Sequence, residues 1–222
     1  MENREYIIFT NETNRHFVDS ISELQSNINL ASYDKEYKVI AISSASAGEG
    51  KSTLAANLAY LYSLKGKKTL LINLDLRKPT SHYFFNVIRD EGIVEYCAGE
   101  CSKEDIIKHT DYKGLDIITS GKKTMFASEL ISSLKVKNLV DELKSQYDYI
   151  IVDTSPINDV TDALLTKNFI DGVVLVVRHN KSKINSVKEA VNKLNENGID
   201  IIGSVLVGVK HKTGYYYYYS DK

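Results

Sequence analysis

Hydrophobic residues in this chain gather in short runs that are separated by longer amphipathic stretches. The runs are rich in Val, Ile and Leu and do not alternate regularly with polar residues, which is typical of strands buried on both faces of a sheet. We predict strands at 38–43, 68–74, 115–119, 147–153, 172–177 and 200–209. The stretches between them predict helices at 52–65, 136–146 and 182–197. The last of these begins at Ser182, a possible N-cap, and stops at Gly198.

A further helix is predicted near the N-terminus, at about 14–31, where apolar residues recur at three-to-four spacing. Alternating strands and helices predict an α/β fold: a mainly parallel sheet with helices on both faces. In such folds the ligand lies at the carboxyl ends of the strands. We expect one domain over residues 1–210 and a flexible tyrosine-rich tail over 211–222.

Composition narrows the possible partners. The chain has 222 residues and a net charge of −1, so charge offers no argument for a nucleic-acid partner, and none is expected. No apolar run approaches the roughly 18 residues needed to cross a bilayer, and the N-terminus lacks the layout of a signal peptide. The expected location is therefore the cytoplasm, with any recruitment to the membrane depending on another protein.

A glycine-rich segment, SASAGEGKST, lies between the first predicted strand and the next helix. It fits the phosphate-loop pattern G-x-x-x-x-G-K-[ST], except that Ala45 replaces the first glycine. Glycines allow backbone N–H groups to curl around phosphate oxygens, and the helix start adds positive charge. We expect Lys51 to reach the β- and γ-phosphates, Ser52 to bind Mg²⁺ and Thr53 to help at the α-phosphate. The predicted ATP-binding residues are Gly48, Glu49, Gly50, Lys51, Ser52 and Thr53.

Two further strands are followed by acidic residues. LLINLDLRKPT carries Asp75 and DYIIVDTSP carries Asp153, each just where an apolar run stops. Carboxylates opposite a phosphate loop hold Mg²⁺ directly or through water, so we predict a metal site of Ser52, Asp75 and Asp153. Arg77 and Lys78 come just after the first acidic end and are candidates for neutralising a transferring phosphate or for contacting a partner. With Lys51, residues 75, 77 and 153 form the predicted catalytic group.

Taken together, GEGKST, LDLRKPT, YDYIIVDTSP and a C-terminus containing YYYYY resemble the bacterial tyrosine kinases. The similarity is greatest to the cytoplasmic kinases of capsular and exopolysaccharide systems of Gram-positive bacteria and runs from about residue 15 to the end. The resemblance implies a fold derived from the cell-division and plasmid-partitioning ATPases. It also implies phosphate transfer from ATP to tyrosine, a membrane activator whose cytoplasmic segment completes the kinase, and an opposing tyrosine phosphatase.

The resemblance also suggests a role for the tail. The expected phosphoacceptors are Tyr215, Tyr216, Tyr217, Tyr218 and Tyr219. Tyrosines on a mobile end can reach the active site of a neighbouring subunit. Each phosphate adds close to two negative charges, so graded phosphorylation would turn the tail acidic and push subunits apart.

The chain departs from the family pattern at the second acidic strand. The family usually shows Asp-x-Asp there, whereas this chain reads Asn73-Leu74-Asp75. The missing carboxylate is the family's candidate general base or second Mg²⁺ contact, and losing a general base typically costs about 10²–10⁴ in rate. Phosphoryl transfer depends more on positioning and charge, so we expect weakened activity rather than none.

Three other departures concern assembly and base recognition. The family's Glu-x-x-Arg-x-x-Arg, which pairs subunits into a ring, is replaced here by Asp19, Ser22 and Gln25, so self-association is expected without its usual arginines. The last strand ends in Val207-Gly208 instead of Asn-Lys, so adenine must be recognised differently. The segment KKTMFASELI lacks its usual prolines.

Two alternatives stay open. In the first, the protein binds ATP as a non-catalytic assembly switch of the same polysaccharide system, and Asn73 marks lost chemistry. In the second, it is a partitioning-type ATPase. Ser46 stands where that class carries a second lysine, which favours the kinase branch.

Overall fold

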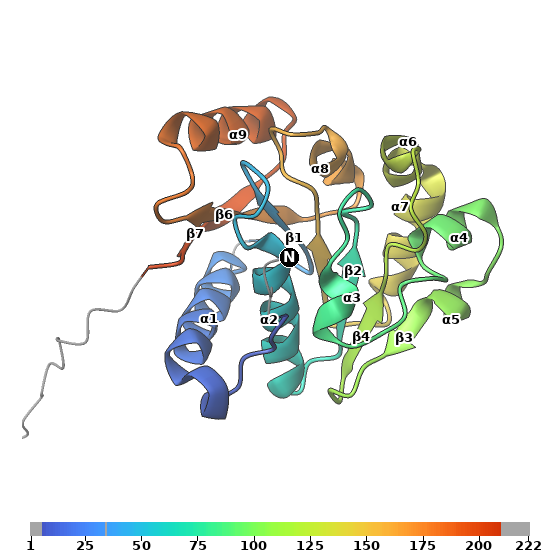
Figure 1. Ribbon diagram of the computed structural model, residues 1–222, viewed down its shortest axis with the longest axis horizontal. Coiled ribbons are helices and arrows are strands. Elements are labelled where there is room, and N and C mark those ends of the chain that lie inside the picture. The colour runs from blue at the N-terminus through green and yellow to red at the C-terminus, as the bar shows by residue number, and fades with distance from the viewer. Residues whose placement is uncertain (1–5, 34, 210–222) are drawn as a thin grey trace, which may run out of the picture.

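The computed structural model of the protein describes residues 6–33 and 35–209. Its centre is a seven-stranded sheet in the order β3-β4-β2-β5-β1-β6-β7 (Figure 1). All neighbouring strands are parallel except the β3–β4 pair at one edge. The strands are β1 (Val39–Ser44), β2 (Thr69–Asn73), β3 (Ile107–His109), β4 (Leu115–Ile118), β5 (Tyr149–Asp153), β6 (Gly172–Arg178) and β7 (Ile201–Val207).

Helices cover both faces of this sheet. Apolar residues of α1 and α2 pack on one face, and those of α6, α7 and α9 pack on the other. The helices are α1 (Asn11–Ala31), α2 (Lys51–Leu64), α3 (Ser81–Phe84), α4 (Ile93–Ala98), α5 (Lys103–Ile106), α6 (Ala127–Ser132), α7 (Leu134–Leu143), α8 (Asp162–Leu165), the 3₁₀ turn η1 (Thr166–Asn168) and α9 (Ile184–Glu196). Within the described residues, no helix is both long enough and apolar enough to cross a membrane.

The alternating architecture predicted from the sequence is confirmed. All six predicted strands and all four predicted helices are present, and the predicted start of the first helix coincides with a kink. At that kink Asn14 is non-helical (φ −161°, ψ 85°), and its Oδ1 accepts a hydrogen bond from Phe17 N at 3.0 Å. The edge strand β3 and the short helices were not predicted, because elements of three to six residues are too short to show a periodicity.

The N-cap predicted for the last helix is wrong. Helix α9 begins at Ile184 with Lys183 as its N-cap residue. The hydroxyl of Ser182 instead accepts a hydrogen bond from Arg178 N and donates to Glu49. Ser182 therefore links the loop before α9 to Glu49, which lies between β1 and α2.

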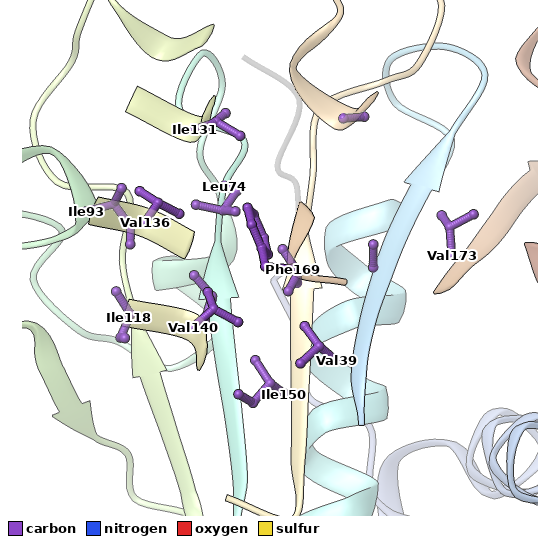
Figure 2. Packing of buried hydrophobic residues seen from close by; sticks show 14 of the residues in the cluster. Val39, Leu74, Ile93, Ile118, Ile131, Val136, Val140, Ile150, Phe169 and Val173 are labelled. Carbon is purple, nitrogen blue, oxygen red and sulfur yellow. The ribbon is translucent and has the colours of Figure 1, made fainter. Parts of the chain in front are cut away.

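The strands do not alternate apolar with polar residues because both of their faces are buried. In β1, Val39 and Ala41 belong to the hydrophobic cluster on one face, and Ile40 and Ile42 belong to the cluster on the other. Figure 2 shows members of the first cluster, among them Phe169, Val39 and Ile150. Since either face needs apolar side chains, polar residues are displaced to the strand ends.

The sheet order brings three of those strand ends together. β1 lies between β5 and β6, and β5 lies between β1 and β2. Ile42 of β1 is the register partner of Asp153, and Asp153 is also the register partner of Asn73 in β2. Whatever follows these strands therefore lies at one carboxyl edge, where α/β folds bind ligands.

A candidate nucleotide and metal site at the carboxyl edge

The phosphate loop joins β1 to α2, and its two glycines adopt left-handed backbone conformations. Gly48 has φ +73° and Gly50 has φ +103°, and Gly50 is the N-cap of α2. Ala45, which replaces the usual first glycine, is fully buried in the core. Among the described residues, the non-glycine positive φ angles belong to Asn86, Glu91 and Asn180, so Ala45 needs no glycine backbone. The loop thus keeps its shape despite the substitution.

Lys51 begins α2 and is buried beside Asp75. The side chains are 7% and 8% exposed, and Lys51 Nζ lies 3.9 Å from Asp75 Oδ2. That distance is an ion pair without a close hydrogen bond, so the ammonium retains donors for a ligand. Asp75 is itself oriented by the backbone, because its Oδ1 accepts from Lys78 N at 3.1 Å. The phosphate-loop lysine and this strand-end carboxylate therefore lie side by side in the structure.

Asp153 is the most deeply buried acid of the site. Burial raises the pKa of its carboxyl to about 6 and Asp75 raises it further, against the lowering effects of Lys51 and of the Ser81 and Ser52 hydroxyls. Ser81 Oγ donates to Asp153 Oδ2 at 2.5 Å, and both side chains are fully buried. A carboxylate that is desolvated to this extent gains from a cation placed beside it.

Among the described residues, several buried side-chain atoms lack a hydrogen-bond partner, and two of them belong to the strand-end residues Asp153 and Asn73. These two are Oδ1 of Asp153 and Nδ2 of Asn73. The other amide atom, Asn73 Oδ1, accepts from Asp75 N at 3.0 Å. Mg²⁺ prefers oxygen ligands such as carboxylates and hydroxyls, and the site offers Asp153, Asp75 and Ser52. The unsatisfied carboxylate oxygen fits a magnesium ion or one of its waters.

Arg77 is paired with the buried acid Asp162. Its Nε lies 2.6 Å from Asp162 Oδ2 and its Nη2 lies 3.1 Å from Asp162 Oδ1. Ser128 Oγ donates to the same Oδ1 at 2.6 Å and also accepts from Nη2 at 3.1 Å. The Asp162 side chain is 1% exposed, whereas that of Arg77 is 42% exposed. The guanidinium thus ties the loop after β2 to α6 and α8, while Lys78 is exposed.

The other positions singled out in the sequence lie on α1, at the end of β7 and in the C-terminal segment. On α1, Asp19 is exposed and pairs with Arg15 at 4.0 Å, whereas Gln25 is buried. Val207 ends β7 beside the phosphate loop, because a Cβ built on Gly50 would lie 3.5 Å from its Cγ2. The tyrosines at 215–219 lie outside the described residues.

Sequence reasoning missed three residues that support the acidic site: Ser81, Ser128 and Asp162. Each comes from a short helix and contacts a functional side chain from a distant part of the chain. A serine or aspartate at a helix start is normally interpreted as a capping residue. Their contacts depend on how the helices pack over the strand ends, so no local pattern signals them.

Comparisons with known proteins bear on the family and fold of the chain. The AAA domain family matches residues 37–202. The chain is 36% identical over 200 residues to the putative tyrosine-protein kinase CapB of Staphylococcus aureus, covering 89% of this chain and 88% of CapB. It is 38% identical over 200 residues to the tyrosine-protein kinase YwqD of Bacillus subtilis strain 168, covering 90% of this chain and 84% of YwqD.

Solved structures confirm the fold class. The kinase domain of the Escherichia coli tyrosine kinase ETK superimposes with a TM-score of 0.84 at 30% identity, covering 91% of this chain and 80% of that one. The septum site-determining protein MinD of Pyrococcus horikoshii, solved with Mg-ADP, matches with a TM-score of 0.65 at 23% identity, covering 76% and 69%. The second likeness concerns the fold alone. Because of its likeness to the ETK kinase domain and its sequence identity to CapB and YwqD, the chain belongs to the bacterial protein-tyrosine kinase family.

Proposed function

We propose that this kinase uses ATP and Mg²⁺ to phosphorylate its own C-terminal tyrosines, 215–219, and thereby regulates capsular or exopolysaccharide synthesis or export. The observation that carries the site assignment is the convergence of Lys51, Asp75 and Asp153 at the ends of neighbouring elements. The unsatisfied Oδ1 of Asp153 supports a cation at the same place.

Each residue has a role that follows from its chemistry. The N–H groups of the phosphate loop and the Lys51 ammonium bind the β- and γ-phosphates. The oxygens of Ser52, Asp75 and Asp153 hold Mg²⁺, which neutralises charge on the transferring group when bound. Arg77 adds positive charge at the rim, in an orientation set by Asp162.

In the reaction, the tyrosine oxygen forms a bond to the γ-phosphorus as the bond to the β–γ bridging oxygen breaks. ADP leaves, and the phenolic proton passes to solvent or to a carboxylate. Asn73 cannot accept that proton as an aspartate would, so the transfer relies on positioning and electrostatic stabilisation. The lack of a proton acceptor at residue 73 therefore supports slow phosphate transfer.

We further propose that a membrane activator recruits the kinase to the inner face of the membrane through its cytoplasmic segment. A tyrosine phosphatase would reverse the modification. Self-association would use contacts other than the family's arginines, because Ser22 and Gln25 stand at the two arginine positions and Gln25 is buried. Up to five phosphates would give the tail strong negative charge and favour dissociation.

The test is intact-mass spectrometry of the purified chain with ATP and Mg²⁺, with and without the cytoplasmic segment of a candidate activator. Lys51→Met serves as the blank, because it removes the charge expected at the γ-phosphate. Phosphates that accumulate on 215–219 in the native chain but not in the variant establish the kinase. Equal phosphotyrosine in both would remove the site assignment.

One observation favours a second function, a nucleotide-dependent assembly switch. Asn73 replaces the family's first carboxylate in the register position next to Asp153. A chain that binds ATP, changes its assembly with nucleotide and gains no phosphate under any of these conditions would support the switch over the kinase.

A further inference from the structure

The loop between β6 and α9 contacts the phosphate loop through two side chains. Lys181 Nζ donates to the Gly48 carbonyl at 2.9 Å, and Ser182 Oγ donates to Glu49 Oε1 at 2.5 Å. The residues are 133 positions apart in sequence, so the contacts depend on the fold. Neither Lys181 nor Ser182 belongs to the phosphate-loop pattern.

The donor loop is closed on itself, which places these side chains in advance. The backbone N–H groups of Lys181 and Ser182 both donate to the Arg178 carbonyl, at 3.1 and 2.9 Å. Ser182 Oγ accepts from Arg178 N at 2.7 Å, and Asn180 supplies the left-handed residue of the turn, with φ +58°. Asn is among the residues that tolerate this conformation best. Little further ordering is then needed to bring the two donors to the phosphate loop.

The Lys181 contact fixes the orientation of one peptide group. In a trans peptide the carbonyl and the following N–H point in opposite directions. With the Gly48 carbonyl held by Lys181, the Glu49 N–H faces the other side of the loop. Phosphate loops bind anions by turning such N–H groups toward the ligand. A Cβ at Gly48 would lie 2.5 Å from Lys181 Nζ, so glycine at this position also makes room for the ammonium.

Glu49 is fixed in the same way. Its side chain is 1% exposed, and its Oε2 accepts from Ser46 N at 3.1 Å while its Oε1 accepts from Ser182. The Glu49 carboxylate therefore bridges the Ser46 N–H and the Ser182 hydroxyl. Both contacts together hold the middle of the loop, Gly48 and Glu49.

We propose that Lys181 and Ser182 are positioning residues of the nucleotide site, which hold the Gly48–Glu49 peptide so that its N–H faces the phosphates of a nucleoside di- or triphosphate. This inference rests on the proposed assignment of the phosphate loop. It gives the β6–α9 loop a role in binding the phosphates rather than a role confined to the stability of the fold.

The test uses the full chain and Mg-ATP titrated by calorimetry. Lys181→Met should raise the Kd about tenfold, the expected scale for losing one charge-assisted hydrogen bond, and Ser182→Ala should raise it several-fold. Lys181→Arg should recover most of the affinity, because it restores a cationic donor. Lys183→Met is the matched control, since that exposed lysine caps α9 two residues away and should leave the Kd unchanged.

Two readouts separate positioning from a merely structural role. The melting temperature of nucleotide-free Lys181→Met should stay within about 3 °C of the native value. In the kinase assay the KM for ATP should rise while kcat at saturating ATP stays nearly constant. A Kd within twofold of the native chain, or a loss of affinity matched by a large loss of nucleotide-free stability, would overturn the inference.

Lys51→Met, titrated in the same way, distinguishes this inference from the function on which it rests. If Lys51→Met binds Mg-ATP as the native chain does, the phosphate-loop assignment itself fails. If Lys51→Met loses affinity and Lys181→Met keeps it, only the role of the β6–α9 loop is wrong.

Discussion

Asn73 and Asp153 are register partners on the parallel strands β2 and β5, and each leaves one buried side-chain atom without a protein partner. The two atoms are the amide Nδ2 of Asn73 and the carboxylate Oδ1 of Asp153. They lie at the carboxyl edge of the sheet, where the phosphate loop follows β1. Asn73 thus offers a neutral donor at the position where the expected family pattern has a carboxylate. An amide at this position gives the site less negative charge than a carboxylate would, and it provides no proton acceptor.

Restoring the acid should therefore exchange stability for activity. We expect Asn73→Asp to raise the autophosphorylation rate at least about tenfold, because it supplies a proton acceptor or a further Mg²⁺ contact. The nucleotide-free variant should melt at a lower temperature than the native chain, because two buried carboxylates then repel each other. Single-turnover kinetics and thermal denaturation check both parts, and an unchanged rate would show that residue 73 does not limit the reaction.

Ser81 should tune the metal site through Asp153. Ser81→Ala removes the hydroxyl that donates to Oδ2 at 2.5 Å and so leaves a fully buried carboxylate oxygen unsatisfied. We expect a several-fold higher Mg²⁺ concentration for half-maximal activity, since the ligand loses its orientation. The control is Ser63→Ala, a buried serine on α2 that donates to Tyr60 O instead. Equal Mg²⁺ dependence of the two variants would argue against this role.

The burial of Asp153 should make the nucleotide-free protein less stable as the pH rises. Its pKa is raised from 3.8 to about 6, so between these values the folded state binds more protons than the unfolded state, and stability falls through this window. A shift of this size corresponds to at most about 3 kcal/mol. Asp153→Asn should therefore be more stable than the native chain at about pH 7.5, and the difference should shrink toward pH 4.

Urea denaturation without Mg²⁺ or nucleotide, at several pH values, measures this difference. The same variant should lose most Mg²⁺-dependent phosphorylation, because the amide is a poor ligand. A variant that is less stable at neutral pH, or whose advantage does not depend on pH, would contradict the assignment of a desolvated carboxylate.

Arg77 and Asp162 should be energetically coupled. Arg77→Ala leaves an acid that is 1% exposed with only the Ser128 hydroxyl to compensate it, and we expect a loss of about 1–3 kcal/mol. Arg77→Lys should rescue little, because an ammonium cannot replace two parallel hydrogen bonds. A double-mutant cycle with Asp162→Asn measures the coupling. Additive free energies of unfolding would mean that the pair contributes no specific stability.

The tail should be phosphorylated in trans. If residues 215–219 reach a neighbouring active site, the rate per molecule rises with protein concentration. Mixing Lys51→Met, as acceptor, with a native chain whose five tail tyrosines are changed to Phe isolates the transfer between molecules. Phosphate on the Lys51→Met chain is the expected result, whereas a rate independent of dilution and an unmodified acceptor would indicate transfer within one chain.

Much of the fold was determined by local sequence. Val39 to Ile42 must be apolar on both faces of a central strand, and that pattern can be recognised without knowing any partner. The phosphate loop is also local, because glycine backbone freedom, one lysine and one serine lie within a few residues before a helix. Asp75 and Asp153 could be predicted because both lie at the carboxyl ends of parallel strands, which share one edge.

Only the tertiary structure decided the supporting contacts. Ser81 on Asp153, Asp162 on Arg77 and Lys181 on Gly48 join residues 72 to 133 positions apart. The side chains involved are common at helix ends and in loops, so their local signals suggest capping or solvent exposure. Their roles arise where packing buries a charge or a carbonyl that then requires a partner, and that requirement exists only once the strand ends have been brought together.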